Sequence, residues 1–402
     1  MAEPSVQQIR SFRLRAHHLD RAYQTSDAAA LAGACGMQNT PPGAWETALH
    51  ARAPGCGLSA LEGLLYRERT LLQAWSFRGT PVVFPTAESA AFLSALCPEG
   101  DEPWLYTNGI GLALDFLGLS FDELLTPLTQ VAPKLNGAAL TSKTALDQTL
   151  AGWMEPLLPA EKRALWNSPS MYGSPDRQTV GGAAVSFLLR PCALRGLVVF
   201  GERAGSSPTF TSYRSWTGHG LEADGDAGKK LARKYLHCYG PATPDLFAAW
   251  LGCSGGQARR VWAGISEEME PVTVFGKTAY ILSADRADLF APAGFGRGPL
   301  LLGGHDPYLD QRDRAVLQPE ASLRRQIWQT VSNPGAIVSD GEVIGVWTGK
   351  KRGADLAVSM TVWTRSPERR TLCELAEAYA AFRRQRLVGV ELDGATRQKA
   401  PE

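Results

Sequence analysis

One supersecondary pattern recurs along this chain of 402 residues: two helix-like segments followed by a β-hairpin. Near the N-terminus, residues 41–53 and 58–67 have helical patterning, and the β-rich run LLQAWSFRGTPVVFP follows them with a Gly-Thr-Pro break in its middle. Two helices and a hairpin in this order are what a winged helix-turn-helix requires. This recurrence constrains the fold more than any single motif in the sequence.

The second and third copies of the pattern lie further along the chain. The second has apolar residues at helical spacing in FDELLTPLTQVA and TSKTALDQTLAGWM, where Thr141 and Ser142 supply N-capping hydroxyls. The run LRGLVVFGERAGSSPTFTSY then predicts a hairpin. The third copy is the clearest: KKLARKYLHCYG predicts one helix, PATPDLFAAWLGCSGGQARRVWAGI predicts two more, and PVTVFGKTAYIL predicts a two-stranded wing.

After Pro299 the sequence becomes strand-like. AIVSDGEVIGVWTG carries Asp340-Gly341, a strong two-residue hairpin signal, and LCELAEAYAAFRRQRL predicts a final helix. We therefore predict an α+β fold with three tandem winged helix-turn-helix units and a C-terminal β-rich, barrel-like domain. The predicted boundaries are residues 1–110, 111–225 and 226–292 for the three units, 293–392 for the C-terminal domain and 393–402 for a tail.

Charge and cysteine usage narrow the classes of partner and cofactor. The 41 basic and 40 acidic side chains nearly cancel, so any nucleic-acid site needs clustered cations. The seven cysteines are far apart, with no CxxC pair, and the adjacent His17 and His18 point to different faces of a helix. We therefore predict no metal and no cofactor. Because no apolar run has the length of a signal peptide or a membrane span, we expect a cytoplasmic protein with no membrane partner.

Four segments stand out along nearly the whole length of the chain. They are GMQNTPPGAW near residue 40, LLQAWSFRGTPVVFP near residue 75, LARKYLHCYGPATPDLFAAWLG near residue 240, and LLLGGHDPYLDQRDR followed by VSDGEVIGVWTG near the C-terminus. In this order they resemble the AlkZ-like winged-helix DNA glycosylases. The resemblance implies three tandem winged-helix units, a C-terminal β-rich domain and a concave surface for duplex DNA.

The resemblance also implies an activity and a catalytic motif. Members of the family excise N7-alkylated guanine, and some unhook interstrand crosslinks. Their signature is a Gln-x-Gln or Gln-x-Asp triplet just before a helix of the first unit. The matching triplet here is Gln38-Asn39-Thr40, so the first position is kept and Thr40 takes the second polar position.

An N7-alkylated purine already carries positive charge, so its glycosidic bond breaks without a strong general acid. The protein must position a water and stabilise an oxocarbenium-like sugar, and the neutral amide of Gln38 suits the first task. Thr40 offers only a hydroxyl, which is a poor base. Two interpretations follow: Gln38 with Asn39 or Thr40 still orders the water, or the chain is a non-catalytic DNA-binding regulator or damage sensor.

Thr40 also has a structural interpretation, because a threonine followed by Pro41 and Pro42 is a good N-cap with proline in the first helical turn. This capping role does not exclude Gln38 from the active site. His305 and Asp306, in GGHDPY, suggest a catalytic pair bordering the cleft, but Asp-Pro is also common turn chemistry.

Several cations are candidates for contacts with the DNA backbone, each against the alternative of a solvated surface residue. Arg78 lies at the tip of the first predicted wing, and Lys350, Lys351 and Arg352 follow a strand that we expect to end at Trp347. The candidates on second helices of the predicted helix-turn-helix units are Lys143, Arg259 and Arg260. Arg383, Arg384 and Arg386 are interpreted as solvated helix-end cations. The expected partner is double-stranded DNA with an alkylated purine, bound by a monomer.

Overall fold

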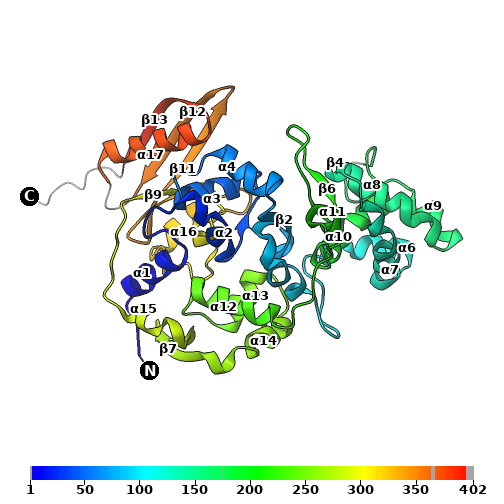
Figure 1. Cartoon of the computed structure of the whole chain (residues 1–402), viewed down its shortest axis with the longest axis horizontal. Helices are drawn as coiled ribbons and strands as arrows, with labels where there is room; N and C mark the ends of the chain where they lie inside the picture. Colours follow the sequence, from blue (N-terminus) through cyan, green and yellow to red (C-terminus); the bar gives the residue numbers. More distant parts are fainter. Residues whose placement is uncertain (1, 174, 364–366, 395–402) are drawn as a thin grey trace, which may run out of the picture. The chain divides into compact units, whose positions relative to one another are not determined.

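The computed structural model describes residues 2–173, 175–363 and 367–394. The chain forms two compact units that are interleaved in sequence. The first unit comprises residues 1–62, 233–247 and 265–402, and the second comprises residues 63–232 and 248–264. Helices and strands occur in both units (Figure 1). The fold is therefore of the mixed α+β type that the sequence predicts.

The first unit opens with short helices and a two-residue strand. Its N-terminal elements are α1 (Val6–Ala16), α2 (Ala28–Gly33), β1 (Met37–Gln38), α3 (Ala44–Arg52) and α4 (Leu58–Glu62). A capping box between Ser5 and Gln8 starts α1. Ile9 and Phe12 of α1 are buried against Val272 and Ile281 of a later hairpin. This packing holds α1, the first helix of the segment that leads to Gln38, against the hairpin.

That hairpin is the predicted third wing. Strands β7 (Met269–Val274) and β8 (Lys277–Leu282) pair antiparallel, with Val274 opposite Lys277 and a turn at Phe275 and Gly276. The helix α15 (Arg286–Phe290) follows and contacts α1. Three helices precede the hairpin, as expected: α12 (Ala227–Tyr239), α13 (Pro244–Leu251) and α14 (Gly255–Ala263). Of these, α12 and α13 run from one unit into the other.

The C-terminal part of the first unit is built on a five-stranded sheet with the order β13-β12-β11-β10-β9. Its strands are β9 (Leu300–Leu302), β10 (Gly335–Ser339), β11 (Glu342–Arg352), β12 (Asp355–Val362) and β13 (Arg386–Gly394). The turn at Asp340 and Gly341 joins β10 and β11, and both residues have positive φ, as a type I′ turn requires. This confirms the predicted hairpin.

The expected barrel-like closure is not observed. In the described residues no sheet closes on itself, and β13 and β9 form the two edges of an open sheet. The reason is the way β13 joins: it pairs parallel to β12, and the helix α17 (Arg369–Phe382) makes the crossover between them. The sequence interpretation had missed β13. Asp393 and Gly394 belong to this strand, whereas 395–402 of the predicted tail lie outside the described residues.

The predicted final helix is confirmed as α17, which lies beside β13 (Figure 1). Its Leu372, Ala376 and Ala380 are spaced four residues apart and are buried together with Trp347 and Met360 of the sheet. An apolar stripe of this spacing is what one face of a helix presents to a sheet. The opposite, charged side of α17 faces solvent.

The second unit has its own core, in which helices predominate. Its main helices are α6 (Gly111–Leu117), α7 (Phe121–Val131), α8 (Lys143–Met154), α9 (Arg163–Trp166), α10 (Val180–Leu194), α11 (Tyr213–Thr217) and α14 (Gly255–Ala263), with a short α5 (Ser89–Phe92). The predicted helices over 121–132 and 141–154 are confirmed, and Ser142 caps α8 as expected. Helix α10 was not predicted.

The strands of the second unit follow the predicted hairpins. β2 (Leu71–Trp75) and β3 (Pro81–Pro85) pair antiparallel on either side of the Gly-Thr-Pro break. β5 (Val199–Phe200) and β6 (Thr209–Thr211) form the second predicted hairpin, and β4 (Leu140–Thr141) adds to β6. Among the helices of the described residues, none is both long and apolar enough to cross a membrane.

Candidate active site

The Gln38-Asn39-Thr40 triplet lies where β1 ends and the loop to α3 begins. Gln38 is 7% exposed and Asn39 is also buried, whereas Thr40 is exposed. Packing of this kind holds the Gln38 carboxamide in one place rather than leaving it to sample rotamers in solvent. The first two side chains of the triplet therefore have fixed surroundings, and the third faces water.

The expectation that Thr40 caps the next helix is wrong. Helix α3 begins at Ala44, its N-cap is Gly43 with φ of 93°, and no side chain caps it. Asn39, in the loop before the helix, instead accepts a backbone hydrogen bond: its Oδ1 lies 2.7 Å from the Gly43 N–H that donates to it. Pro41 and Pro42 stand in the turn before the helix, not in its first turn. The Asn39 carboxamide thus shapes the loop that carries Thr40.

The side chain of Gln38 meets a histidine from the far end of the sequence. Its Nε2 lies 3.3 Å from Nδ1 of His305. The donor is the amide N–H, so the contact requires an unprotonated Nδ1 on His305. The structure thereby brings together two residues that the sequence singled out separately, and this pairing is the centre of the candidate site.

His305 lines a pocket of about 400 Å³ within the first unit. The start of α3 forms one wall, with Pro41, Pro42 and Thr47, and the sheet supplies another. Gln38 is not among the lining residues, so its contact with the pocket runs through His305. The pocket thus has His305 at its wall and the Gln38 carboxamide directly behind it.

The charge of this pocket is positive. Its lining side chains include Lys351 of β11 and Arg383, which directly follows α17, and no carboxylate among the described residues lines it. Arg383 also pairs with Glu46 of α3 at 2.7 Å. The sequence interpretation had treated Arg383 as a solvated cation, because a helix-end arginine carries no signal of a pocket formed by other elements.

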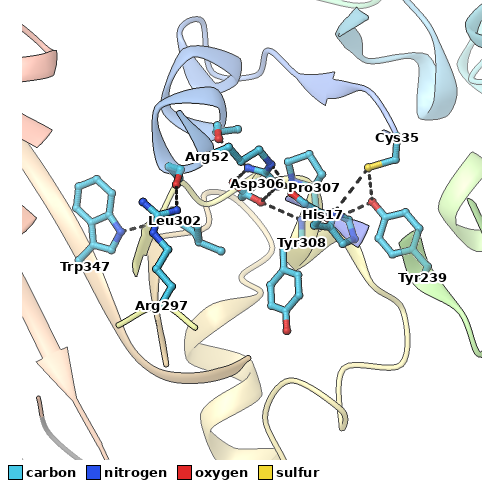
Figure 2. A network of polar contacts seen from close by, with 12 residues as sticks. His17, Cys35, Arg52, Tyr239, Arg297, Leu302, Asp306, Pro307, Tyr308 and Trp347 are labelled. Carbon is cyan, nitrogen blue, oxygen red and sulfur yellow. Dashed lines mark hydrogen bonds and ion pairs between the residues drawn. The ribbon is translucent and has the colours of Figure 1, made fainter. Parts of the chain in front are cut away.

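Asp306 faces away from the pocket and anchors the loop that carries His305. Both of its oxygens accept hydrogen bonds from the Arg52 guanidinium, at 2.8 and 3.0 Å, and Oδ1 also accepts from the Tyr308 N–H (Figure 2). Arg52 is the last residue of α3, and both side chains are almost fully buried. The predicted His305-Asp306 pair is therefore divided: His305 lies at the site, and Asp306 holds its loop to α3.

A second histidine lies on α3, near the same pocket residues. Burial, together with the nearby charges of Arg297 and Arg383, lowers the pKa of His50 to about 4. Its ring stacks on Phe382 with 4.1 Å between centroids. His50 is consequently neutral at physiological pH and adds no charge to this region.

The remaining predicted DNA-contacting cations, which lie in the second unit, differ in how many hydrogen bonds and ion pairs they form within the protein. Arg78 donates a 2.6 Å hydrogen bond to the Trp250 carbonyl. Lys143 is bound to Asp147 at 2.8 Å and to Ser186, and burial lowers its pKa. The other two are on α14, where Arg259 is exposed and Arg260 is paired with Glu99 and Glu102. Their contacts with DNA stay predictions.

We expected Lys350, Lys351 and Arg352 to follow the strand, but they form its last three residues. β11 continues past Trp347 to Arg352, which lies opposite Asp355 of β12. Neighbouring side chains of a strand point to opposite faces, so these three cations cannot all face one groove. Lys351 is the one that lines the pocket.

One group in the described residues has the composition of a metal site, although the sequence predicted none. His17, Cys35 and Cys238 are buried, and their potential ligand atoms lie within 4.8 Å of one another. Cys35 Sγ is 3.8 Å from His17 Nδ1 and accepts a hydrogen bond from the Tyr239 hydroxyl (Figure 2). Cys238 donates to the Ala34 carbonyl. The spacing along the chain gave no signal for this group, because its members come from three separate segments.

Comparisons with known proteins agree on one family. The model of the DNA glycosylase AlkZ-like family matches residues 31–382. An interstrand DNA cross-link repair glycosylase of Streptomyces sahachiroi is 27% identical over 360 residues, which are 85% of this chain and 87% of the relative. The solved structure of the Streptomyces sahachiroi DNA glycosylase AlkZ has a TM-score of 0.74 and 23% identity, and the match covers 97% of this chain and 100% of that chain. The chain belongs to the AlkZ-like DNA glycosylase family.

Proposed function

We propose that this glycosylase hydrolyses the N-glycosidic bond of cationic N7-alkylated purines in duplex DNA, with Gln38 positioning the attacking water. The observation that carries the proposal is the contact between Gln38 Nε2 and His305 Nδ1 at the wall of a cationic pocket. A positioned amide suits this substrate because the base leaves as a neutral group and needs no strong acid. Positioning and electrostatics then supply the rate enhancement.

The donor and acceptor roles follow from the geometry. Because the Gln38 nitrogen donates to His305, its carbonyl oxygen is the atom that we assign to the water. His305 must then carry its proton on Nε2, on the other side of the ring. We infer that His305 is a positioning residue, and that Asp306 and Arg52 keep its loop in register with Gln38.

Thr40 replaces the second amide or carboxylate of the family triplet, and this departure bears on the rate. Its side chain is exposed beside Pro41 and Pro42, which line the pocket. A hydroxyl there can bond a water but cannot stabilise a cationic sugar as a carboxylate would. We therefore infer an enzyme that depends on the intrinsic lability of its cationic substrate.

The relative from Streptomyces sahachiroi is named for repair of interstrand crosslinks, and we extend that substrate class to this chain as part of the proposal. We further propose that the three helix-helix-hairpin segments act as winged helix-turn-helix units, with α13, α14 and the β7–β8 hairpin as the third. Such units hold duplex DNA by backbone contacts. We propose that Arg78, Lys143, Arg259, Arg260, Lys350, Lys351 and Arg352 take part, in a monomer.

The test is base release from duplex DNA containing N7-methylguanine. Gln38→Ala should lower the single-turnover rate by roughly 10- to 1,000-fold, as expected for the loss of one positioning group. His305→Ala should lower it less, because it acts through Gln38. Gln7→Ala, at an exposed glutamine on α1, is the matched control and should leave the rate unchanged.

One observation favours a rival function, in which the protein binds DNA without cleaving it: the second catalytic position is Thr40. The same assay separates the two. If the wild type binds duplex DNA but releases no base from either the methylated or a crosslinked duplex, the hydrolytic proposal is wrong and the rival stands.

A further inference from the structure

A second cationic pocket lies in the first unit, between residues 312–315, the helix α16 (Ala321–Ile327) and the tip of the β7–β8 hairpin. We call it the arginine pocket. It measures about 420 Å³ and is lined by Phe275, Arg312, Asp313, Arg314, Ala315, Ala321, Arg324, Arg325 and Trp328. It shares no lining residue with the pocket at His305.

The one carboxylate that lines this pocket is already neutralised. Arg13, which is buried in α1, donates to Asp313 Oδ1 at 3.0 Å and to Oδ2 at 2.7 Å. By contrast, Arg314, Arg324 and Arg325 form no ion pair within the described part of the chain. The lining side chains therefore carry an excess of positive charge, which the nearby Asp310 carboxylate, acting on Arg314, reduces only in part.

Burial makes this excess costly. Burial lowers the pKa of Arg314, and the neighbouring Arg312 lowers it further. Arg324 donates one Nη2 hydrogen bond to the Pro319 carbonyl, while its Nε is buried without a hydrogen-bond partner. Clustered guanidinium groups with unused donors are stabilised by an anion, which restores both the charge balance and the hydrogen bonds.

Aromatic side chains stand beside these guanidinium groups. Arg314 lies over the Trp328 ring at 4.8 Å, and Trp328 Nε1 donates to the Leu309 carbonyl, which holds the ring in place. Phe275 is 57% exposed at the tip of the β7–β8 hairpin, in the left-handed region with φ of 49°. A two-residue type I′ turn requires this conformation at Phe275 and Gly276, and the turn leaves the aromatic ring exposed at the tip of the hairpin.

We propose that the arginine pocket holds a backbone phosphate of duplex DNA, with Phe275 against the adjoining sugar. The inference rests on the proposed function only in taking DNA as the polyanion. Guanidinium forks match the oxygens of a phosphodiester, and such contacts fix the register of a protein on its duplex without reading sequence. A phosphate held in this way contributes affinity that does not depend on the neighbouring base.

The test is the salt dependence of binding to an undamaged fluorescent duplex, measured by anisotropy. Each lost phosphate contact reduces the slope of log affinity against log salt by about 1. Arg325→Ala should show this loss, and because the side chain is exposed the variant should fold like the wild type. Arg314→Ala should show the same loss, whereas Arg314→Lys should restore most of the slope because it keeps the charge.

Two further variants complete the design. Phe275→Ala should weaken binding by about 5-fold or more at fixed salt, as for other aromatic contacts with nucleotides, and leave the slope unchanged. Arg177→Ala, at an exposed arginine without an ion pair in the described residues, is the control for the change in net charge and should leave the slope at its wild-type value.

Unchanged slopes for both Arg314→Ala and Arg325→Ala would overturn the inference. So would weakened binding of inorganic phosphate in these variants with an unchanged duplex slope, because the pocket would then take a free anion. The assay uses undamaged DNA and needs no base release. A failure here is therefore distinguishable from a failure of the proposed chemistry at Gln38.

Discussion

At the scale of single residues, the site depends on a buried ion pair that holds His305 in place. The Arg52 and Asp306 side chains are 2% and 0% exposed. Replacing Asp306 by Asn keeps its shape but leaves the Arg52 charge buried without a counter-charge, which should destabilise the protein by about 3–5 kcal/mol. Urea unfolding measures this loss.

The control for this prediction is an exposed pair of the same type. Arg386 and Asp355 form an ion pair at 2.8 Å, with side chains 75% and 34% exposed. Arg386→Ala should cost under about 1 kcal/mol, because water and salt screen such pairs. A similarly small cost for Asp306→Asn would contradict the anchoring role assigned to the buried pair.

His50 predicts a specific dependence of stability on pH. Its pKa is about 4 in the folded protein, mainly through burial, against 6.5 for an ordinary histidine. Between these two values the unfolded chain binds a proton that the folded protein does not, so His50 lowers stability as pH falls from about 6.5 to about 4. His50→Asn should flatten the slope of Tm against pH in this window.

The same change at the exposed His219 is the matched control, and should leave the slope as in the wild type. His50→Asn also loses the stacking on Phe382, so its Tm should be lower at pH 7. The prediction concerns the slope, not the level. An unaltered slope in His50→Asn would show that this ring is not the group that titrates.

At this scale the sequence identified candidate site residues, but it did not show which side chains they contact. Gln38 followed from the resemblance of its triplet, and His305 from its motif, yet 267 positions separate them in the chain. No local pattern connects residues so far apart. Arg383 was missed for the same reason. In the arginine pocket most lining residues lie within 312–328, but Phe275 and the Arg13 partner of Asp313 come from distant elements.

At the scale of elements, prediction succeeded where the signal is local. Turn chemistry at Asp340 and Gly341, N-capping by Ser142 and the apolar stripe of α17 each gave the correct element. It failed where pairing is long-range. β13 pairs parallel to β12, and a helix forms the crossover between them. No short sequence motif predicts such a crossover. The barrel-like expectation was therefore wrong.

The alternation of β11 gives a prediction for its three terminal cations. Lys351 lines the pocket at His305, whereas Lys350 points to the other face of the strand. Lys351→Ala should therefore lower base release from bound N7-methylguanine duplex more than Lys350→Ala does. Single-turnover rates at saturating enzyme separate this effect from affinity.

The two variants control for each other, because each removes one positive charge from the same strand end. Equal losses of rate in the two would mean that the side of the strand is immaterial, and the assignment of Lys351 to the pocket would fail. A loss of salt dependence in Lys350→Ala alone would still agree with the proposed backbone contact of that residue.

At the scale of the whole molecule, the chain passes between its two compact units four times. The sequence predicted consecutive domains with boundaries at 110, 225 and 292, and those boundaries stay a prediction. What the structure adds is that α12 (Ala227–Tyr239) and α13 (Pro244–Leu251) each contribute residues to both units. A helix interrupted at such a point would lose hydrogen bonds on both sides, because helix formation is cooperative.

This continuity predicts one cooperative unfolding transition, although the chain has two units. Differential scanning calorimetry of the wild type should show a single peak, because melting either unit unravels helices that the other needs. Ala232→Pro, next to the unit boundary within α12, should cost about 3 kcal/mol and shift that peak without splitting it. Ala223→Pro, in the exposed loop before α12, is the control and should have little effect. Two resolved peaks in the wild type, or a shift of only one of them in Ala232→Pro, would show that the units unfold independently despite the helices they share.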